Sequence, residues 1–155
     1  MEIWNLRIWK NMFIGEYNHA IDAKKRVSLP VKFRGKLADG CVVTRGLDKC
    51  LWVYPMKEWE NIAGKVAALP KTSQKARSFS RFIFSAADEA KVDKVGRINI
   101  PQTLKDFAEI TDKVVIIGGY DYIEIWSEQV WKSFKDEMEE SSEEVAETLT
   151  NLQAD

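Results

Sequence analysis

Two stretches of the chain, 71 residues apart, place apolar and polar residues in the same order. Residues 21–30 read IDAKKRVSLP and residues 92–101 read VDKVGRINIP. Each has an apolar residue, Asp, three further residues, Arg, an alternating segment and Pro. Alternation is typical of a half-buried strand, and Asp is a typical residue of a tight turn. The pattern predicts two similar β-hairpins.

The similarity continues through more than forty residues of each half once one extra residue is allowed in the second copy. VVTRG at 42–46 aligns with VVIIG at 114–118, and LWVYP at 51–55 aligns with IEIWS at 123–127. Self-similarity of this length indicates an internal structural repeat. We therefore expect both halves of the chain to share one fold.

Each copy predicts the same order of elements. Short strands are expected at EYNHAI and EAKV before the turns, and at RVSL and RINI after them. Pro30 and Pro101 cannot continue a strand ladder but suit the first turn of a helix, which predicts helices at VKFRGKL and QTLKDFA. CVVTRGLDKCLWVYP and VVIIGGYDYIEIW then predict strand–turn–strand units.

Amphipathic helices are expected at MKEWENIAGKVAAL and SEQVWKSFKDEMEE, with Ser127 as a candidate N-cap of the second. Between the copies, SQKARSFSRFIF predicts a helix with Arg77 and Arg81 away from its apolar side. The expected fold class is α+β and rich in strands. We divide the chain into an N-terminal extension or alternative start (1–11), a first repeat (12–70), a connecting helix or linker (71–86), a second repeat (87–140) and an acidic tail that is helical or frayed (141–155).

The net charge of −1 conceals a division along the chain. Residues 12–107 contain eighteen Lys and Arg against ten Asp and Glu, whereas residues 108–155 contain three against thirteen. A basic body suits an anionic polymer as partner. The plainer alternative is that these side chains solvate the surface.

Several classes of protein are disfavoured by the composition. There is no apolar run long enough for a transmembrane span, and the N-terminus has no signal-peptide pattern. Cys41, Cys50 and a single histidine, His19, are too few for a zinc site, and both thiols suit burial in a reducing cytoplasm. We interpret His19 as a strand residue. No nucleophile–base pair, metal set or Gly-rich cradle is found, so we expect no enzyme and no cofactor.

Other candidate residues also have plain structural interpretations. Arg77 and Arg81 could contact phosphate, but surface pairing or subunit packing is the default. The acidic side chains of the tail are interpreted as a solvated helix face rather than a metal site. Core or subunit-interface packing is expected for Trp52, Trp59, Trp126 and Trp131.

The two turns have a complete structural explanation. Asp22 and Asp93 can accept hydrogen bonds from backbone N–H groups two or three residues further on, and Arg26 and Arg97 can pair with them. Gly96 suits such a turn because glycine adopts positive φ readily.

A functional hypothesis adds the cations around the turns. A two-stranded ribbon can enter the DNA major groove, where Lys holds phosphates and Arg contacts guanine. On this hypothesis, the DNA-binding residues are Lys24, Lys25, Arg26, Lys94 and Arg97.

The chain resembles the MraZ family of bacterial regulators over roughly residues 12–145. The similar stretches are MFIGEYNHAIDAKKRVSLPVKFR, VVTRGLDKCLWVYPMKEWE, KARSFSRFIFSAADEAKVDKVGRINIPQTL and IEIWSEQVW. The resemblance implies tandem AbrB-like (SpoVT-AbrB) swapped-hairpin repeats that form a pseudo-twofold double-split β-barrel with flanking helices. It also implies a ring-shaped homo-oligomer, such as an octamer, in the cytoplasm and on the nucleoid. Such a ring would bind short direct repeats in its own promoter and repress an operon for cell division and the cell wall.

Four residues match the family motifs: Asp22, Arg26, Asp93 and Arg97. Lys25 departs from the pattern, because the family usually has Gly just before the first Arg, as Gly96 stands here before the second. Lys25 must therefore tolerate the backbone of the turn, or the turn must differ.

One alternative from another class is a non-enzymatic protein-interaction module, such as a scaffold ring or an antitoxin-like partner. The position of the basic side chains distinguishes a DNA-binding protein from such a scaffold. An exposed basic face favours DNA, whereas burial of Arg26 and Arg97 within a subunit interface favours the scaffold.

Overall fold

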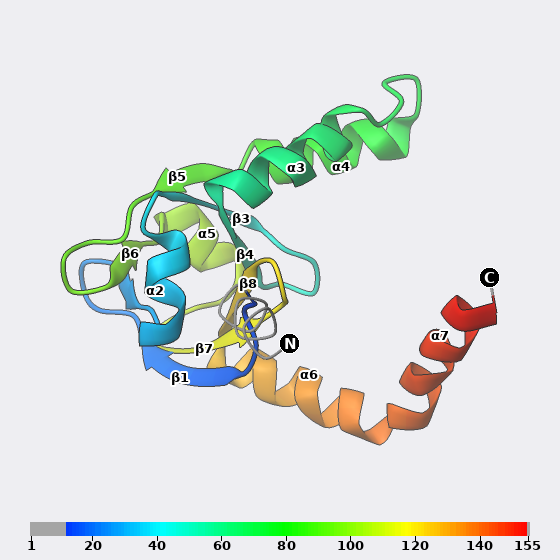
Figure 1. Cartoon of the computed structure of the whole chain (residues 1–155). Helices are drawn as coiled ribbons and strands as arrows, with labels where there is room; N and C mark the ends of the chain where they lie inside the picture. Colours follow the sequence, from blue (N-terminus) through cyan, green and yellow to red (C-terminus); the bar gives the residue numbers. More distant parts are fainter. Residues whose placement is uncertain (1–11, 155) are drawn as a thin grey trace, which may run out of the picture.

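The computed structural model describes residues 12–154 and contains two copies of one β-β-α-β-β-α unit (Figure 1). The predicted repeat is thereby confirmed, and the expected extension at 1–11 lies outside the described residues. The first copy comprises β1 (Glu16–Ala20), β2 (Arg26–Ser28), α2 (Val31–Leu37), β3 (Cys41–Arg45), β4 (Leu51–Pro55) and α3 (Met56–Ala67). The second comprises β5 (Asp88–Ala90), β6 (Arg97–Asn99), α5 (Gln102–Phe107), β7 (Lys113–Gly118), β8 (Ile123–Ser127) and α6 (Glu128–Glu140). Helix α4 (Gln74–Phe84) connects the copies, and α7 (Ser142–Ala154) follows the second.

The two copies exchange their first strands. A six-stranded antiparallel sheet has the order β1-β7-β8-β4-β3-β5, and β2 pairs with β6 in a separate two-stranded ribbon. Strand β1 thus lies beside β7 of the second copy, and β5 lies beside β3 of the first. This is the swapped-hairpin arrangement that the resemblance implies. The sheet is not closed into a barrel, because β1 and β5 form its two edges.

The strand register reveals a pseudo-twofold symmetry between the two copies, because two residues of the first copy each pair with their own equivalent in the second. Val27 lies opposite its counterpart Ile98 in the ribbon, and Trp52 lies opposite its counterpart Glu124 between β4 and β8. Because each residue faces its own equivalent, the two copies are related by an approximate twofold axis that passes between β2 and β6 and between β4 and β8.

The core lies between the sheet, the ribbon and helices α2 and α5. The apolar residues of both alternating segments are buried, among them Val27, Leu29, Ile98 and Ile100. Phe33 of α2 is 2% exposed and packs edge-on against Phe13, with 5.0 Å between ring centroids. Burial of one such side chain contributes about 1.5–3 kcal/mol. The core therefore fixes the base of the ribbon.

The cysteines and tryptophans are packed as the sequence predicts. Cys41 and Cys50 are both free thiols that are fully buried, and burial raises the pKa of Cys41 to about 11. The Trp126 ring lies 5.2 Å from Trp131, and Trp59 lies 6.0 Å from Phe84.

Helix starts differ in detail from the expectation. Pro30 and Pro101 occupy the N-cap positions of α2 and α5, one residue before the first helical turn. Ser127 is the N-cap residue of α6, but its side chain makes no capping hydrogen bond. Ser73 instead caps α4, since its Oγ accepts a hydrogen bond from the Ala76 N–H at 3.2 Å.

Two helical arms leave the sheet. Helices α3 and α4 run side by side away from it, and α6 continues into α7 as a second arm (Figure 1). The acidic tail, for which the sequence is compatible with either a helix or a frayed end, forms helix α7. Within residues 12–154, no helix has both the length and the apolar composition to cross a lipid bilayer.

Candidate nucleic-acid interface

The first turn is held by the carboxylate of Asp22. Its Oδ1 accepts hydrogen bonds from the backbone N–H groups of Lys24 and Arg26, both at 2.9 Å. Its Oδ2 accepts a hydrogen bond from Nε of Arg26 at 2.8 Å. One carboxylate therefore shapes the turn and also fixes the plane of the arginine side chain.

The second turn repeats this geometry. Asp93 Oδ1 accepts from the N–H groups of Val95 at 3.0 Å and Arg97 at 2.9 Å, and Oδ2 accepts from Arg97 Nε at 2.8 Å. In both turns the acceptor reaches the residues two and four positions further on, rather than two and three. The more distant donor is the backbone N–H of the arginine, which is the first residue of the return strand, β2 or β6.

Lys25 and Gly96 occupy equivalent positions with left-handed backbone. Lys25 has φ 62° and Gly96 has φ 83°. The first turn thus keeps the backbone of the second, and Lys25 tolerates a conformation that normally favours glycine. The strain is local, because Lys25 N–H still donates to Asp22 O at 3.0 Å, as Gly96 N–H does to Asp93 O.

The two turns are joined into one unit. Arg97 Nη1 lies 3.9 Å from Asp22 Oδ2, and the Asn99 side-chain amide donates to Lys24 O at 3.1 Å. The backbone N–H of Ile100 donates to Lys25 O at 2.8 Å. A movement of one turn therefore displaces the other.

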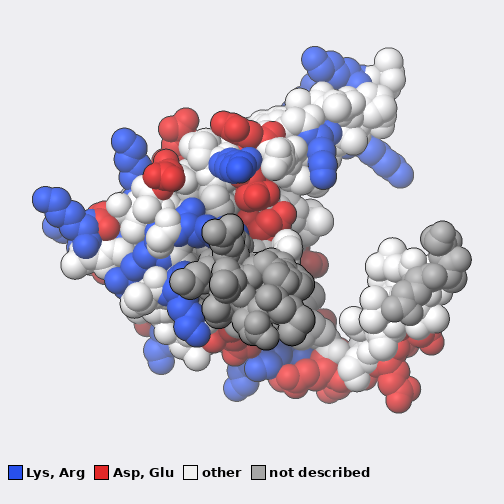
Figure 2. Space-filling view, in the orientation of Figure 1, with Lys and Arg blue, Asp and Glu red and all other residues white. Residues whose placement is uncertain are grey.

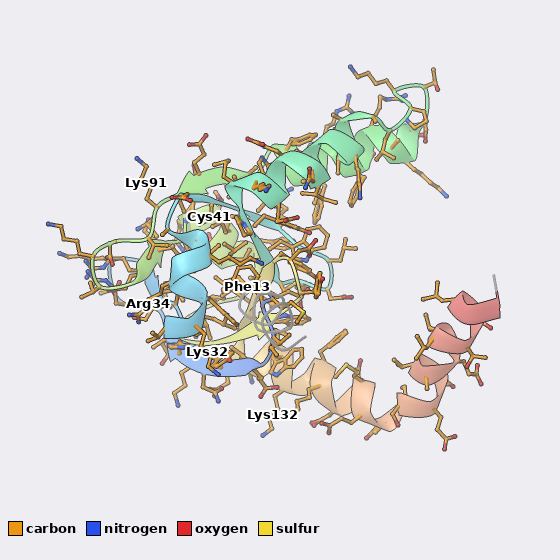
Figure 3. All side chains as sticks on the ribbon, viewed as in Figure 1. Phe13, Lys32, Arg34, Cys41, Lys91 and Lys132 are labelled. Carbon is orange, nitrogen blue, oxygen red and sulfur yellow. The ribbon has the colours of Figure 1, made fainter. Side chains whose placement is uncertain are left out.

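Arg34 of α2 supports the second turn. Its Nε donates to Leu29 O at 2.9 Å, and its side chain lies against Gly96, where a Cβ atom would overlap it. Figure 3 shows Arg34 on the side of α2 that faces the turns. This role of Arg34 is not predicted from the sequence, although a basic residue also stands at the equivalent position, Lys105.

Hydrogen bonding sets the charge state of both turn carboxylates. The backbone N–H of Arg26, with its guanidinium and the Lys24 N–H, holds the pKa of Asp22 below its ordinary value. The N–H of Arg97 acts in the same way on the pKa of Asp93. Both groups are therefore anionic at neutral pH, and each neutralises part of the charge of its arginine.

The basic side chains of the turns face solvent. Lys24 and Lys94 are exposed, and the Arg26 and Arg97 side chains are 31% and 28% exposed. Within one chain, therefore, neither Arg26 nor Arg97 is buried against the Asp of its own turn. Figure 2 shows Lys and Arg side chains gathered at the end of the molecule where the turns project, whereas acidic side chains are prominent along the arm of α6 and α7.

Each turn aspartate uses only part of the hydrogen-bonding capacity of its arginine. A guanidinium has five N–H donors, and the bond to its own Asp uses the one on Nε. The terminal nitrogens can thus meet a further acceptor, such as a guanine edge or a phosphate.

Within residues 12–154, the histidine and the acidic side chains outside this interface do not form a metal site. His19 lies in β1 opposite Val114, and burial, with Arg34 nearby, lowers the pKa of its imidazole. Across residues 12–154, no three His, Cys, Asp or Glu side chains gather as metal ligands would.

Comparison with known proteins gives a consistent result. Residues 12–82 and 83–153 each match the model of one family, described as "MraZ protein, putative antitoxin-like". The chain is 50% identical to the "Transcriptional regulator MraZ" of Halothermothrix orenii over 141 residues, which cover 91% of this chain and 99% of that protein. Proteins of the same name from Natranaerobius thermophilus and Thermoanaerobacter pseudethanolicus are 46% and 48% identical over the same shares of both chains.

Proposed function

The chain belongs to the MraZ family, and on that basis we propose that it is a transcriptional regulator that binds double-stranded promoter DNA through its two Asp-x-x-x-Arg turns. The family is named for a regulatory and non-enzymatic role. The observation that carries the proposal is the pairing of both turns on the β2–β6 ribbon, with their cations exposed or part-exposed at one end of the molecule.

In this mechanism the lysines and arginines have different tasks. Lys24, Lys25 and Lys94 contact phosphates and so position the ribbon, which gives affinity without sequence preference. Arg26 and Arg97 read base edges in the major groove, where a bidentate contact to guanine discriminates by about 1–3 kcal/mol. Asp22, Asp93 and the bend at Gly96 hold both guanidinium groups before DNA arrives, which lowers the entropic cost of ordering them.

The two turns carry different charge. The tip of the first has Lys24 and Lys25, whereas Val95 and Gly96 stand at the equivalent positions of the second. Val95 is 59% exposed. The first turn is thus better suited to phosphate, and the second offers an apolar contact such as a thymine methyl group.

A single chain offers few phosphate contacts and would bind weakly. We propose that copies assemble into a ring, such as an octamer, and that neighbouring subunits engage successive short direct repeats. Each contact after the first is then effectively intramolecular, which raises affinity without new contacts. The proposed target is the promoter of the protein's own division and cell-wall operon, which it represses in the cytoplasm at the nucleoid. We also propose that the chain is divided into a first repeat at 12–70, a connecting segment at 71–86, a second repeat at 87–140 and an acidic tail at 141–155.

The second candidate is a protein-interaction ring that does not bind DNA. The observation in its favour is α7, whose side chains are exposed throughout residues 142–152.

Fluorescence anisotropy with DNA from just upstream of the protein's own gene tests the proposal. The titration is run at several salt concentrations, with a scrambled duplex of equal length and composition as control. We expect binding to weaken steeply with salt and to prefer the native repeats. Equal affinity for both duplexes would reject sequence-specific regulation, and no binding to either would favour the protein-interaction ring.

A further inference from the structure

Helix α7 has an apolar stripe that no other part of residues 12–154 covers. Val145, Leu149 and Leu152 are 54%, 61% and 68% exposed and recur at intervals of four and three, which places them on one helix face. Every residue from 142 to 152 is exposed. An isolated helix of 13 residues is marginally stable in water, so α7 requires a packing partner.

A groove of matching character lies between α3 and α4. It has a volume of about 380 Å³, and its apolar wall includes Leu69, Ala76 and Phe84. Leu69 and Phe84 are 37% and 36% exposed there. Arg77 and Arg81 stand among its lining residues. No residue of α7 lines it, and Figure 1 shows α7 standing apart from α3 and α4 of the same chain.

The charges of the two surfaces are opposite. Residues 71–85 contain four Lys and Arg and no Asp or Glu, whereas α7 contains Glu143, Glu144 and Glu147 and no Lys or Arg. Pairing of α7 with another α7 would bring two anionic helices together. The α3–α4 groove instead offers an apolar floor and cations within reach of Glu144, which flanks the stripe next to Val145.

We propose that α7 of one copy docks its Val145–Leu149–Leu152 stripe into the α3–α4 groove of a second copy. The lengths agree, since α7 spans about 20 Å and α3 about 18 Å at 1.5 Å per residue. The contact joins two different surfaces, so each copy offers one helix and one groove. Such head-to-tail contacts close into a ring when the rotation permits. The inference rests on the proposed assembly of copies, but not on DNA binding.

The test measures the mass of the full chain without DNA by light scattering and native mass spectrometry. The tail variant Leu149→Ser/Leu152→Ser replaces two of the three apolar residues of the stripe, and the groove variant Ser80→Trp fills the groove. The control Glu143→Ala/Glu147→Ala alters the opposite face of the same helix. We expect both variants to fall to the mass of one 17.8 kDa chain with unchanged circular dichroism, and the control to keep the assembly of the unmodified protein.

Mixing the two variants in equal amounts decides the geometry. The tail variant keeps its groove and the groove variant keeps its α7, so one contact can form and the mixture should yield a heterodimer. The inference is wrong if either variant keeps the full assembly, if no heterodimer forms, or if the unmodified chain is a monomer. An assembly that behaves as expected but does not bind promoter DNA would reject the proposed function alone.

Discussion

Arg97 of the second repeat reaches Asp22 of the first, with 3.9 Å between Nη1 and Oδ2, while its Nε donates to Asp93 at 2.8 Å. One guanidinium therefore lies between the carboxylates of both turns. Since the pairs are part-exposed, we expect the link to contribute orientation more than stability. The two arginines that we propose as base-reading groups are thus held in one frame.

Replacement of either arginine should weaken specific DNA binding while assembly is kept. For Arg26→Ala and Arg97→Ala we expect a loss of about 1–3 kcal/mol each, or about fivefold to 160-fold in Kd, because one base contact is removed. Anisotropy with native and scrambled duplexes measures the effect, and light scattering measures the assembly. Lys132→Ala, which removes a cation from α6, is the matched control. Unchanged affinity, or collapse of the oligomer, would reject the assignment of these arginines.

Lys25→Gly should make the protein more stable and a poorer binder. The left-handed backbone at Lys25 costs about 1–2 kcal/mol, part of which is offset by the greater freedom of glycine in the unfolded chain. We expect a net gain of about 0.5–1 kcal/mol in urea unfolding and a salt slope for DNA binding smaller by about 1. Lys24→Ala removes the same charge without relief of φ, so it should reduce the slope and leave stability unchanged. A destabilised Lys25→Gly protein would contradict this account of the turn.

The turn carboxylates should make stability depend on acidic pH. The pKa values of Asp22 and Asp93 are lower in the folded chain than in the unfolded chain. Their contribution is therefore complete above the ordinary pKa and is lost as pH falls through the lowered one. Urea midpoints at pH 7, 4 and 2.5 measure this loss. Asp22→Asn/Asp93→Asn should be less stable at pH 7 and show a flatter decline, whereas Asp39→Asn, outside both turns, should follow the unmodified protein. Parallel declines for all three proteins would show that the turns do not act this way.

Gly96→Ala should destabilise the protein for two separable reasons. The added Cβ would overlap the Arg34 side chain, and φ 83° is unfavourable for alanine. We expect a cost of about 1–3 kcal/mol in urea unfolding. In an Arg34→Ala background the overlap is absent, so the same substitution should cost less. An equal cost in both backgrounds would mean that Arg34 moves aside freely.

Local features of this fold could be predicted from the sequence because they depend on neighbours in the chain. Alternation around Val27 and Ile98, the turn chemistry of Asp22 and Asp93 and the conformational freedom of Gly96 all act within a few residues. The apolar spacing of α4 belongs to the same class of signal. These patterns placed the strands, both turns and the helices close to their observed positions.

Other features depend on contacts between distant residues, which one sequence does not encode in its spacing. The resemblance implied a swapped-hairpin fold, but the pairing of β1 with β7 is not encoded in any periodicity of the sequence. The contact of Arg34 with Gly96 joins residues 62 positions apart. Ser127 has the right residue type for a capping side chain but is buried at the end of β8, where its side chain makes no capping hydrogen bond. Tertiary packing decided each of these outcomes.

The exchange of first strands also constrains how the protein is made. During synthesis, β1 leaves the ribosome almost a hundred residues before its partner β7. One edge of β3 likewise stays unpaired until β5 has been synthesised. Until then, the nascent first half presents unpaired strand edges, which are templates for association with other chains. Neither half can complete its sheet alone, so the sheet can form in full only after β7 and β8 have been synthesised. On a polysome, several incomplete chains of this kind bring complementary strand edges close together. A chaperone that shields β1 and β3 would act before β5 and β7 have been synthesised.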